Sequence, residues 1–246
     1  MTHERSSSML KDFKIYSGTI MGPQHERLGL PNQDSGLYVN YPDLAVACVA
    51  DGAGSLKRSD YGAELACNLF LEEALRKIED SNSSLGEIVF DSLSFARKEI
   101  FKQDSYKELG CTFAGVIWKQ DELAAIALGD AEIAVHFADG NHHGITELQN
   151  HEYANITNLL TSDSFNPHVF YTNEDILGVS IFSDGLSPVS IDANGIPLAG
   201  FWSPLLSRAF EEQLDIPALL DFLNGKHRII DDTTLIMAVK GRDESF

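Results

Sequence analysis

The sequence predicts an α+β fold in which antiparallel sheets are covered by helices. Its expected elements follow the order strands, two helices, strands, helices and a strand, without the regular alternation of a parallel βαβ protein. The chain has 246 residues, of which 43% are hydrophobic, and this is enough for one sizeable core. No Pro- or Ser-rich linker and no internal repeat divides it. We therefore expect one domain over residues 1–246, with its core at about 13–240.

The first half of the chain contains apolar strands followed by two amphipathic helices. Residues 13–21 are expected to form a strand, and residues 44–50 (LAVACVA) form an apolar run that stops at an Asp-Gly pair, as a buried strand does. Asp60 is expected to cap a long helix with apolar residues at spacings of three and four. Residues 80–84 break this helix. A second helix follows, with Val89, Leu93, Ala96 and Ile100 on one side.

The middle of the chain changes to a strand pattern. Residues 111–118, 123–128 and 131–137 are expected to be consecutive strands of an antiparallel meander. Gly129 and Asp130 lie between the second and third strands, and Asp-Gly at 139–140 ends the third.

The last part of the chain mixes both kinds of element. Residues 151–171 are polar and irregular and are expected to be a long surface segment, and 178–182 to be a strand. Helices are expected at 204–213 and 217–223, each with proline near its start, where the missing N–H costs little. Residues 233–239 are expected to form the final strand.

The charge and cysteine content narrow the class of protein. The chain has 18 basic and 37 acidic residues and a net charge of -19. Such a surface repels nucleic acid and anionic lipid, so we expect neither as a partner. Three cysteines without C-x-x-C spacing favour a reduced cytoplasm over a disulfide framework. No signal peptide and no apolar run of membrane-spanning length is visible.

Aspartates recur at the ends of apolar strands. Each lies in a short polar motif: Asp34 in NQDS, Asp51 in ADGAGS, Asp130 in LGDA, Asp184 in SDGL, and Asp231 and Asp232 in DDTT. One such motif alone is an ordinary turn. Together they offer the oxygen ligands that Mg²⁺ and Mn²⁺ prefer, and two such ions about 3.5–4 Å apart can orient a hydroxide for attack on phosphorus.

In combination and order, these motifs resemble the type 2C (PPM) metal-dependent serine/threonine protein phosphatases. The resemblance runs from about residue 15 to 239. It is strongest to a bacterial branch with Gln-Asp in place of Glu-Asp, in segments such as GTIMGPQHERLGLPNQDS, VADGAGS, GCTFAGVIW, ALGDAEI, HEYANIT, IFSDGL and DDTTLIM. It implies a four-layer αββα sandwich of two antiparallel sheets flanked by helices, with the metal ions at one edge.

The resemblance also implies roles for individual residues. Asp51 matches the aspartate that bridges two metal ions, and Gly52 supplies a backbone carbonyl to one of them. Asp184 matches a ligand of the other ion. Asp231 matches the last ligand, which puts Asp232 in the place of an asparagine.

Two further aspartates match residues around those ions. Asp34 matches an aspartate that holds metal-bound water, and Asp130 matches one that helps to bind a third, weaker ion. Gln33 stands where better-known members have glutamate. Its amide oxygen could ligate a metal ion or hydrogen-bond a bound water, but it brings no charge, so the second ion is expected to bind less tightly.

Two substrate-handling residues of better-known members are missing. Ala53 stands in place of a general-acid histidine, and Gly29 in place of a phosphate-binding arginine. Just upstream, His25 is expected in a loop, where it could donate to phosphate or protonate a leaving alkoxide, or make only a structural hydrogen bond. Arg27 could bind phosphate oxygens or be a surface charge.

Two other polar segments are ambiguous. His142 and His143 are expected in a hairpin turn and are not expected to bind metal. Residues 151–157 are expected in a flap over the site, where Asn155 and Thr157 could orient substrate or simply make a local turn.

The implied activity is hydrolysis of phosphoserine and phosphothreonine esters by a metal-bridging hydroxide. The cofactors would be two Mn²⁺ or Mg²⁺ ions, with a third held more weakly. The partner would be a phosphoprotein substrate, with the enzyme opposing a serine/threonine kinase. One alternative is a pseudophosphatase that binds metal or phosphoprotein without turnover. Another is a metal-dependent hydrolase of small phosphate esters.

Overall fold

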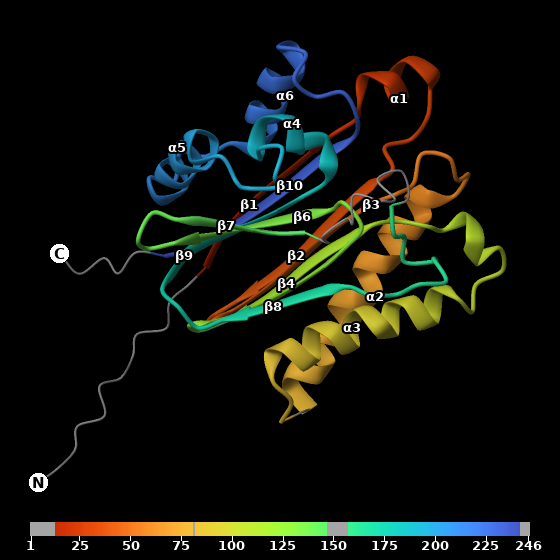
Figure 1. Cartoon of the computed structure of the whole chain (residues 1–246), viewed down its shortest axis with the longest axis horizontal. Helices are drawn as coiled ribbons and strands as arrows, with labels where there is room; N and C mark the ends of the chain where they lie inside the picture. Colours follow the sequence, from red (N-terminus) through yellow and green to blue (C-terminus); the bar gives the residue numbers. More distant parts are fainter. Residues whose placement is uncertain (1–12, 81, 147–156, 242–246) are drawn as a thin grey trace, which may run out of the picture.

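The computed structural model describes residues 13–80, 82–146 and 157–241. Two five-stranded antiparallel sheets pack against each other (Figure 1). Sheet A has the order β1 (Phe13–Ile20), β10 (Thr233–Lys240), β9 (Ile176–Phe182), β6 (Glu132–Phe137) and β7 (His142–Ile145). Sheet B has the order β2 (Asp34–Tyr41), β3 (Leu44–Asp51), β4 (Phe113–Lys119), β5 (Glu122–Leu128) and β8 (His168–Thr172).

Helices cover the outer face of each sheet. Sheet B carries α2 (Ser59–Asp80) and α3 (Leu85–Ile100), and sheet A carries α4 (Ser187–Ser190), α5 (Ala199–Phe210) and α6 (Ile216–Gly225). A short helix, α1 (Pro23–Leu28), joins β1 to β2, and 3-10 turns occupy Tyr106–Glu108 and Asp184–Leu186. This arrangement confirms the predicted four-layer sandwich. Among the described residues, no helix is long and apolar enough to cross a membrane.

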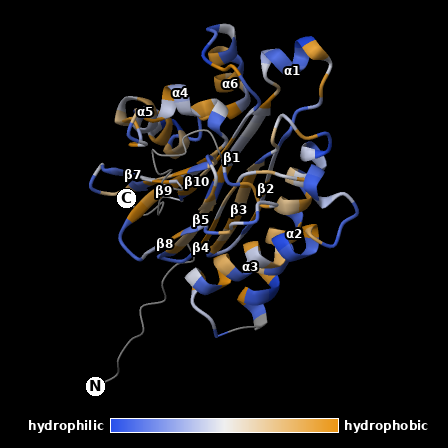
Figure 2. Cartoon of the chain, turned by 45° about the vertical axis from the view of Figure 1, so that its right-hand side comes forward, coloured by the Kyte–Doolittle hydropathy of each residue, from blue (hydrophilic) through white to orange (hydrophobic). Residues whose placement is uncertain are grey.

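Three apolar layers hold the sandwich together. The middle layer lies between the two sheets and contains Val49, Val116 and Ile181. Two outer layers lie between each sheet and its helices, for example around Phe70 on sheet B and Trp202 on sheet A. Figure 2 shows hydrophobic colour on the strands and on the helix faces that point toward them. Burial of these side chains, worth about 1.5–3 kcal/mol each, fixes the layers that carry the functional residues.

The predicted meander is wrong at its third strand. β4 and β5 pair as expected, but β6 pairs with β9 and β7 in the other sheet. The chain crosses between the sheets at Gly129 and Asp130. Gly129 has a φ of 78°, and a Cβ atom there would lie 2.6 Å from the Asn158 carbonyl oxygen. The alternation of side chains predicts the two faces of a strand, but it does not predict the neighbouring strand.

The strands absent from the sequence prediction all lie at sheet edges. β2 and β8 are the two edges of sheet B, and β7 is an edge of sheet A. Edge strands expose one side to solvent and carry polar residues, which weakens the apolar pattern. β8 lies within the predicted irregular segment 151–171, and His142 and His143 lie in β7 and not in the turn that precedes it.

Two predicted helix starts need correction. α2 begins at Ser59, so Asp60 lies in the first turn and is not the cap. α5 begins at Ala199 and contains Pro204 in its interior, where the helix loses one N–H donor. The break at 80–84 agrees with the structure, because Ser84 forms a reciprocal capping box with Glu87 at the start of α3.

Candidate metal centre

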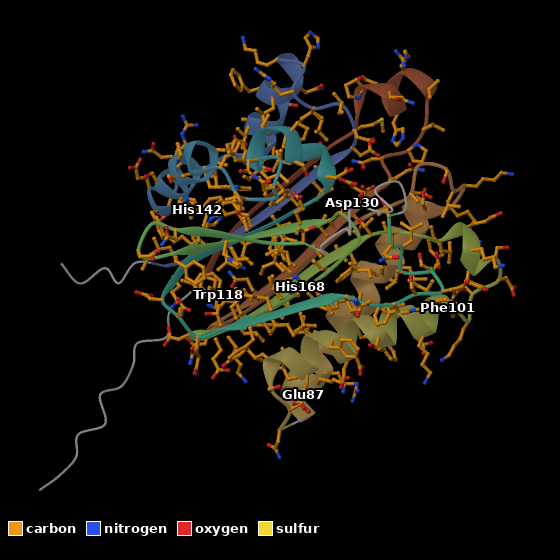
Figure 3. The ribbon with its side chains drawn as sticks, in the orientation of Figure 1. Glu87, Phe101, Trp118, Asp130, His142 and His168 are labelled. Atoms are coloured by element: carbon orange, nitrogen blue, oxygen red, sulfur yellow. The ribbon has the colours of Figure 1, made fainter. Side chains whose placement is uncertain are left out.

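Four of the predicted aspartates meet at one edge of the sandwich. Asp51 is the last residue of β3, and Asp130 lies at the crossing from β5 to β6 (Figure 3). Asp184 follows β9 by two residues, and Asp231 precedes β10 by two. Both sheets therefore contribute carboxylates, and the site lies at the seam between them.

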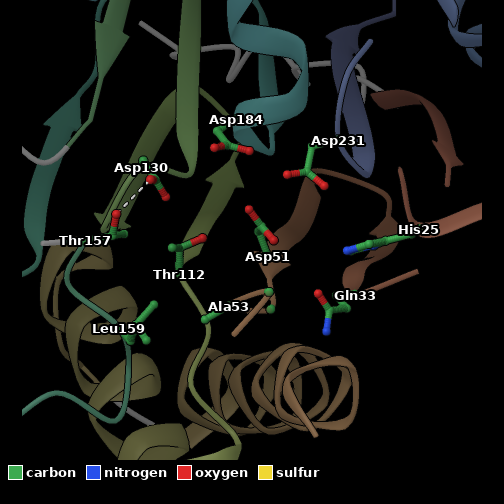
Figure 4. A pocket seen from close by; sticks show the side chains of 12 residues that line it. His25, Gln33, Asp51, Ala53, Thr112, Asp130, Thr157, Leu159, Asp184 and Asp231 are labelled. Atoms are coloured by element: carbon green, nitrogen blue, oxygen red, sulfur yellow. Dashed lines mark hydrogen bonds between the residues drawn. The ribbon is translucent and has the colours of Figure 1, made fainter. Parts of the chain in front are cut away.

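These side chains surround a cavity of about 270 Å³. Figure 4 shows the carboxylates of Asp51, Asp130, Asp184 and Asp231 directed into it. Single oxygens of the first three lie within 4.8 Å of one another, close enough to share one cation. The cavity is lined by His25, Gln33, Asp51, Gly52, Ala53, Gly54, Thr112, Asp130, Thr157, Leu159, Asp184 and Asp231.

The crowding of carboxylates changes their acidity. Burial raises the pKa of Asp51 well above its ordinary value, and the nearby charges of Asp34, Asp184, Asp130 and Asp231 raise it further. Burial, with Asp130 and Asp231, raises the pKa of Asp184 to about 6. Carboxylates this close together repel one another when all are ionised. A bound proton or a bound cation removes this repulsion.

Three buried oxygens at or beside the cavity accept no hydrogen bond from any described residue. They are Gln33 Oε1, Asp34 Oδ1 and Thr112 Oγ1. A buried polar atom without a partner costs about 1–3 kcal/mol, which a bound cation or an ordered water can offset. These atoms are hard oxygen donors, as are the carboxylates, and such a set fits Mg²⁺ or Mn²⁺.

Asp34 lies behind Asp51 and does not line the cavity. The two residues face each other across the β2–β3 ladder, and Asp34 Oδ2 accepts a hydrogen bond of 2.6 Å from Ser183 Oγ. Burial raises the pKa of Asp34 to about 7. Because Ser183 follows β9, this bond ties the two sheets together beside the carboxylates.

Gly52 brings the backbone against the cavity. Its N–H donates to the Gln33 carbonyl at 3.0 Å. A Cβ atom at this position would lie 2.6 Å from the Ser59 carbonyl oxygen and 2.8 Å from the Gln33 carbonyl oxygen. A larger residue would therefore push apart the segments that hold the candidate ligands.

Asp231 and Asp232 are adjacent but face different surroundings. Asp231 lines the cavity, whereas Asp232 is 3% exposed and does not. Asp232 accepts hydrogen bonds from Gly22 N at 2.7 Å, Gln33 N at 2.6 Å and His25 Nδ1 at 2.7 Å. This division agrees with the predicted register, and the ligand role of Asp231 remains a prediction.

The structure separates His25 from Arg27. His25 is buried, lines the cavity and lies in α1, so the prediction of a loop was wrong. Arg27 is exposed and is not among the cavity-lining residues. Gly29 ends α1 with a φ of 67°, a conformation that suits glycine and strains an arginine.

Three further polar residues lie at or beside the cavity, and only one of them, Thr157, was singled out from the sequence. Thr112, in the segment GCTFAG, lies just before β4 and faces the carboxylates. Thr157 Oγ1 donates to Asp130 Oδ2 at 3.0 Å, which places the end of the predicted flap at the site. Residues 151–156, including Asn155, lie outside the described residues. Glu132, on β6, is a buried acid whose pKa burial raises to about 7, and an acid inside an apolar strand was its only signal.

Comparisons with known proteins agree with this geometry. A family model described as protein phosphatase 2C matches residues 21–224. The chain is 29% identical to serine/threonine-protein phosphatase 3 of Escherichia coli (strain K12), over 92% of this chain and 97% of that protein.

Two solved structures share the fold. One is the catalytic domain of the serine threonine protein phosphatase PstP in complex with two manganese ions, with 16% identity, 94% of this chain and 100% of that chain covered, and a TM-score of 0.65. The other is RsbX in complex with magnesium, with 13% identity, coverage of 97% and 98%, and a TM-score of 0.60. At these identities the likeness shows the fold alone.

Proposed function

The chain belongs to the protein phosphatase 2C family, and from this we propose that it is a metal-dependent serine/threonine protein phosphatase. It hydrolyses phosphoserine and phosphothreonine esters of proteins. The observation that carries the proposal is the ring of Asp51, Asp130, Asp184 and Asp231 around one cavity. The similarity to a serine/threonine-protein phosphatase of Escherichia coli supports the same activity.

The cofactors we propose are two Mn²⁺ or Mg²⁺ ions, with a third held more weakly near Asp130. Asp51, Asp184 and Asp231 would hold these ions through their carboxylates, and Gly52 through its backbone carbonyl. Gln33 would offer its amide oxygen. When bound, such ions supply Lewis acidity that lowers the pKa of water and neutralises charge on phosphoryl oxygens.

The side chains of the protein orient the reactants. Asp34, held by Ser183, has a second carboxylate oxygen without a partner among the described residues, and this oxygen would hold a water beside the candidate ligands. Thr112 offers a buried hydroxyl at the cavity wall. Attack at phosphorus breaks the bond to the serine or threonine oxygen, which leaves as a hydroxyl after it receives a proton.

Gln33 and Ala53 replace a glutamate and a histidine of better-known family members, and this loss would favour a pseudophosphatase. Other residues of the cavity argue against that alternative. The candidate ligands Asp51, Asp184 and Asp231 are all present and face one cavity. His25 brings an imidazole to the same cavity. We therefore favour an enzyme that binds its metal ions less tightly over a binding module without turnover.

We further propose that the enzyme opposes a serine/threonine kinase in the cytoplasm. The three cysteines are buried and free of disulfides, which suits a reduced compartment.

Hydrolysis of phosphothreonine and phosphoserine peptides, with Mn²⁺, with Mg²⁺ and with EDTA, tests the proposed activity. We expect turnover that needs the cation and that exceeds turnover of small phosphate esters such as phosphoserine itself. Metal binding without turnover of any ester would indicate the pseudophosphatase. Preference for the small esters would indicate a hydrolase of small molecules.

A further inference from the structure

A buried aspartate next to the candidate ligands holds the imidazole that faces the cavity. Asp232 is 3% exposed, and its two oxygens accept three hydrogen bonds. Oδ1 accepts from Gly22 N at 2.7 Å, and Oδ2 accepts from Gln33 N at 2.6 Å and contacts His25 Nδ1 at 2.7 Å. Asp232 itself does not line the cavity, whereas two of its partners, His25 and Gln33, do.

The chemistry of these partners requires a carboxylate at position 232. A backbone N–H can only donate, and one faces each oxygen of Asp232. An asparagine in either orientation would turn its NH₂ group toward one of those donors. The side chain must therefore accept on both sides.

The same argument fixes the ring of His25. Because a carboxylate oxygen only accepts, His25 Nδ1 must carry the hydrogen that it shares with Asp232. The other ring nitrogen, Nε2, is then the atom that can gain or lose a proton. The backbone holds this arrangement, since Leu30 N donates to the His25 carbonyl at 3.0 Å and Gly29 ends the helix.

The ring is directed at the reaction site. Figure 4 shows His25 pointing into the cavity toward Asp51 and Asp231. Of the described residues that line the cavity, His25 alone has an ionisable nitrogen. The carboxylates there are candidate metal ligands, and a ring nitrogen of His25 also lies within 4.8 Å of single oxygens of Asp231 and Asp232. Because Nδ1 is bonded to Asp232, Nε2 is the ring atom that can act on a substrate.

We propose that His25 Nε2 donates a proton to the leaving oxygen of the substrate and that Asp232 is the positioning residue for its ring. The inference rests on the proposed phosphatase function. Water adds to phosphorus, the bond between phosphorus and the serine or threonine oxygen breaks, and its electron pair stays on that oxygen. The Nε2 proton completes the hydroxyl. One proton of the water then restores Nε2, and the other stays on hydrogen phosphate.

The choice of leaving group tests this role. An alkoxide from phosphothreonine needs a proton as it leaves, whereas p-nitrophenolate is stable without one. The experiment measures kcat at saturating Mn²⁺ for a phosphothreonine peptide and for p-nitrophenyl phosphate. The variants are His25→Gln, Asp232→Asn and the double variant, with Glu26→Gln, an exposed neighbour in α1, as the matched control.

We expect large losses of kcat on the peptide substrate and only small ones on p-nitrophenyl phosphate. His25→Gln should lower kcat for the peptide by about 10²–10⁴-fold, the usual contribution of general acid catalysis, and kcat for p-nitrophenyl phosphate by far less. Asp232→Asn should lower kcat for the peptide by about 10–100-fold, as expected for a partner that orients a histidine. The double variant should match His25→Gln, because Asp232 acts through the ring.

A second readout does not depend on activity. In the metal-free protein, ¹H–¹⁵N correlation NMR of the His25 side chain should show the hydrogen on Nδ1, and Asp232→Asn should abolish that preference. If Asp232→Asn does not fold, His25→Gln and the wild-type spectrum still decide the question.

Several outcomes would overturn the inference. Equal losses on the two substrates, a hydrogen on Nε2 alone in the neutral ring, or a higher Mn²⁺ requirement with unchanged kcat would each refute it, the last by showing His25 to be a metal ligand. These results would leave the phosphatase function standing. Wild-type protein without turnover of either substrate would instead refute the proposed function, and this inference with it.

Discussion

Replacing Asp51 by asparagine should remove activity and stabilise the metal-free protein. Asp51 is the carboxylate most crowded by others, with Asp34, Asp184, Asp130 and Asp231 all raising its pKa after burial. In the proposed site its charge also serves two cations. The same side chain therefore costs stability without metal and is needed for turnover with it.

The sign of the stability change follows from the direction of the pKa shift. In the unfolded chain Asp51 ionises near pH 4, whereas in the folded metal-free protein its pKa lies well above that value. The folded state thus binds more protons, and stability falls as the pH rises above about 4. Asp51→Asn should therefore raise the Tm in EDTA at pH 8, and for a domain of this size each 1 kcal/mol gained corresponds to about 2–4 °C.

Thermal unfolding in EDTA and phosphopeptide turnover in Mn²⁺ measure the two effects. The gain in Tm should shrink as the pH is lowered from 8 toward 5. Asp221→Asn, an exposed site on α6 with the same change in net charge, serves as the control and should leave both Tm and turnover near those of the wild type. Near-normal turnover of Asp51→Asn at saturating Mn²⁺, or a lower Tm in EDTA, would refute the assigned position of Asp51.

Three further predictions concern the other aspartates of the site, the amide of Gln33 and the pH dependence of stability. Asp184→Ala and Asp231→Ala should each lose most turnover of p-nitrophenyl phosphate. Asp232→Ala should lose less, because the oxygens of Asp232 accept hydrogen bonds from backbone N–H groups and do not face the cavity. A larger loss for Asp232→Ala than for Asp231→Ala would show that the ligand is assigned one residue too early. Gln33→Glu should lower the Mn²⁺ concentration for half-maximal activity, with a smaller effect on the maximal rate, since a carboxylate adds charge where the amide oxygen has no partner. An unchanged or weaker metal titration would contradict this. Finally, metal-free wild type should lose stability from about pH 4 to pH 7, because the folded pKa is about 7 for Asp34 and about 6 for Asp184. Melting curves in EDTA that are flat or rising over this window would disprove it.

The sequence predicted the site best where buried strands end. Runs such as 44–50 are apolar on both faces, and the aspartate that follows must lie at the rim of the sheet. The family resemblance then put these ends in one place, and Asp51, Asp130, Asp184 and Asp231 do meet there. Their roles as ligands remain predictions.

Other features depended on contacts that sequence patterns do not carry. The edge strands β2, β7 and β8 are half exposed, so their apolar signal is weak. The sheet to which β6 belongs depends on the crossing at Gly129, which only the packed structure defines. The pairing of Asp232 with His25 joins opposite ends of the chain, and no local pattern predicts such a contact.

The position of the aspartates at the seam of the two sheets has a consequence for synthesis of the protein. Asp51 is made early, but Asp231 precedes the last strand, and β10 can insert between β1 and β9 only after almost the whole chain has left the ribosome. Contacts so distant in sequence form late in folding. A growing chain therefore carries several acidic strand ends but no complete cation site. Cations stabilise only the fully folded protein, as any ligand specific to the native state does.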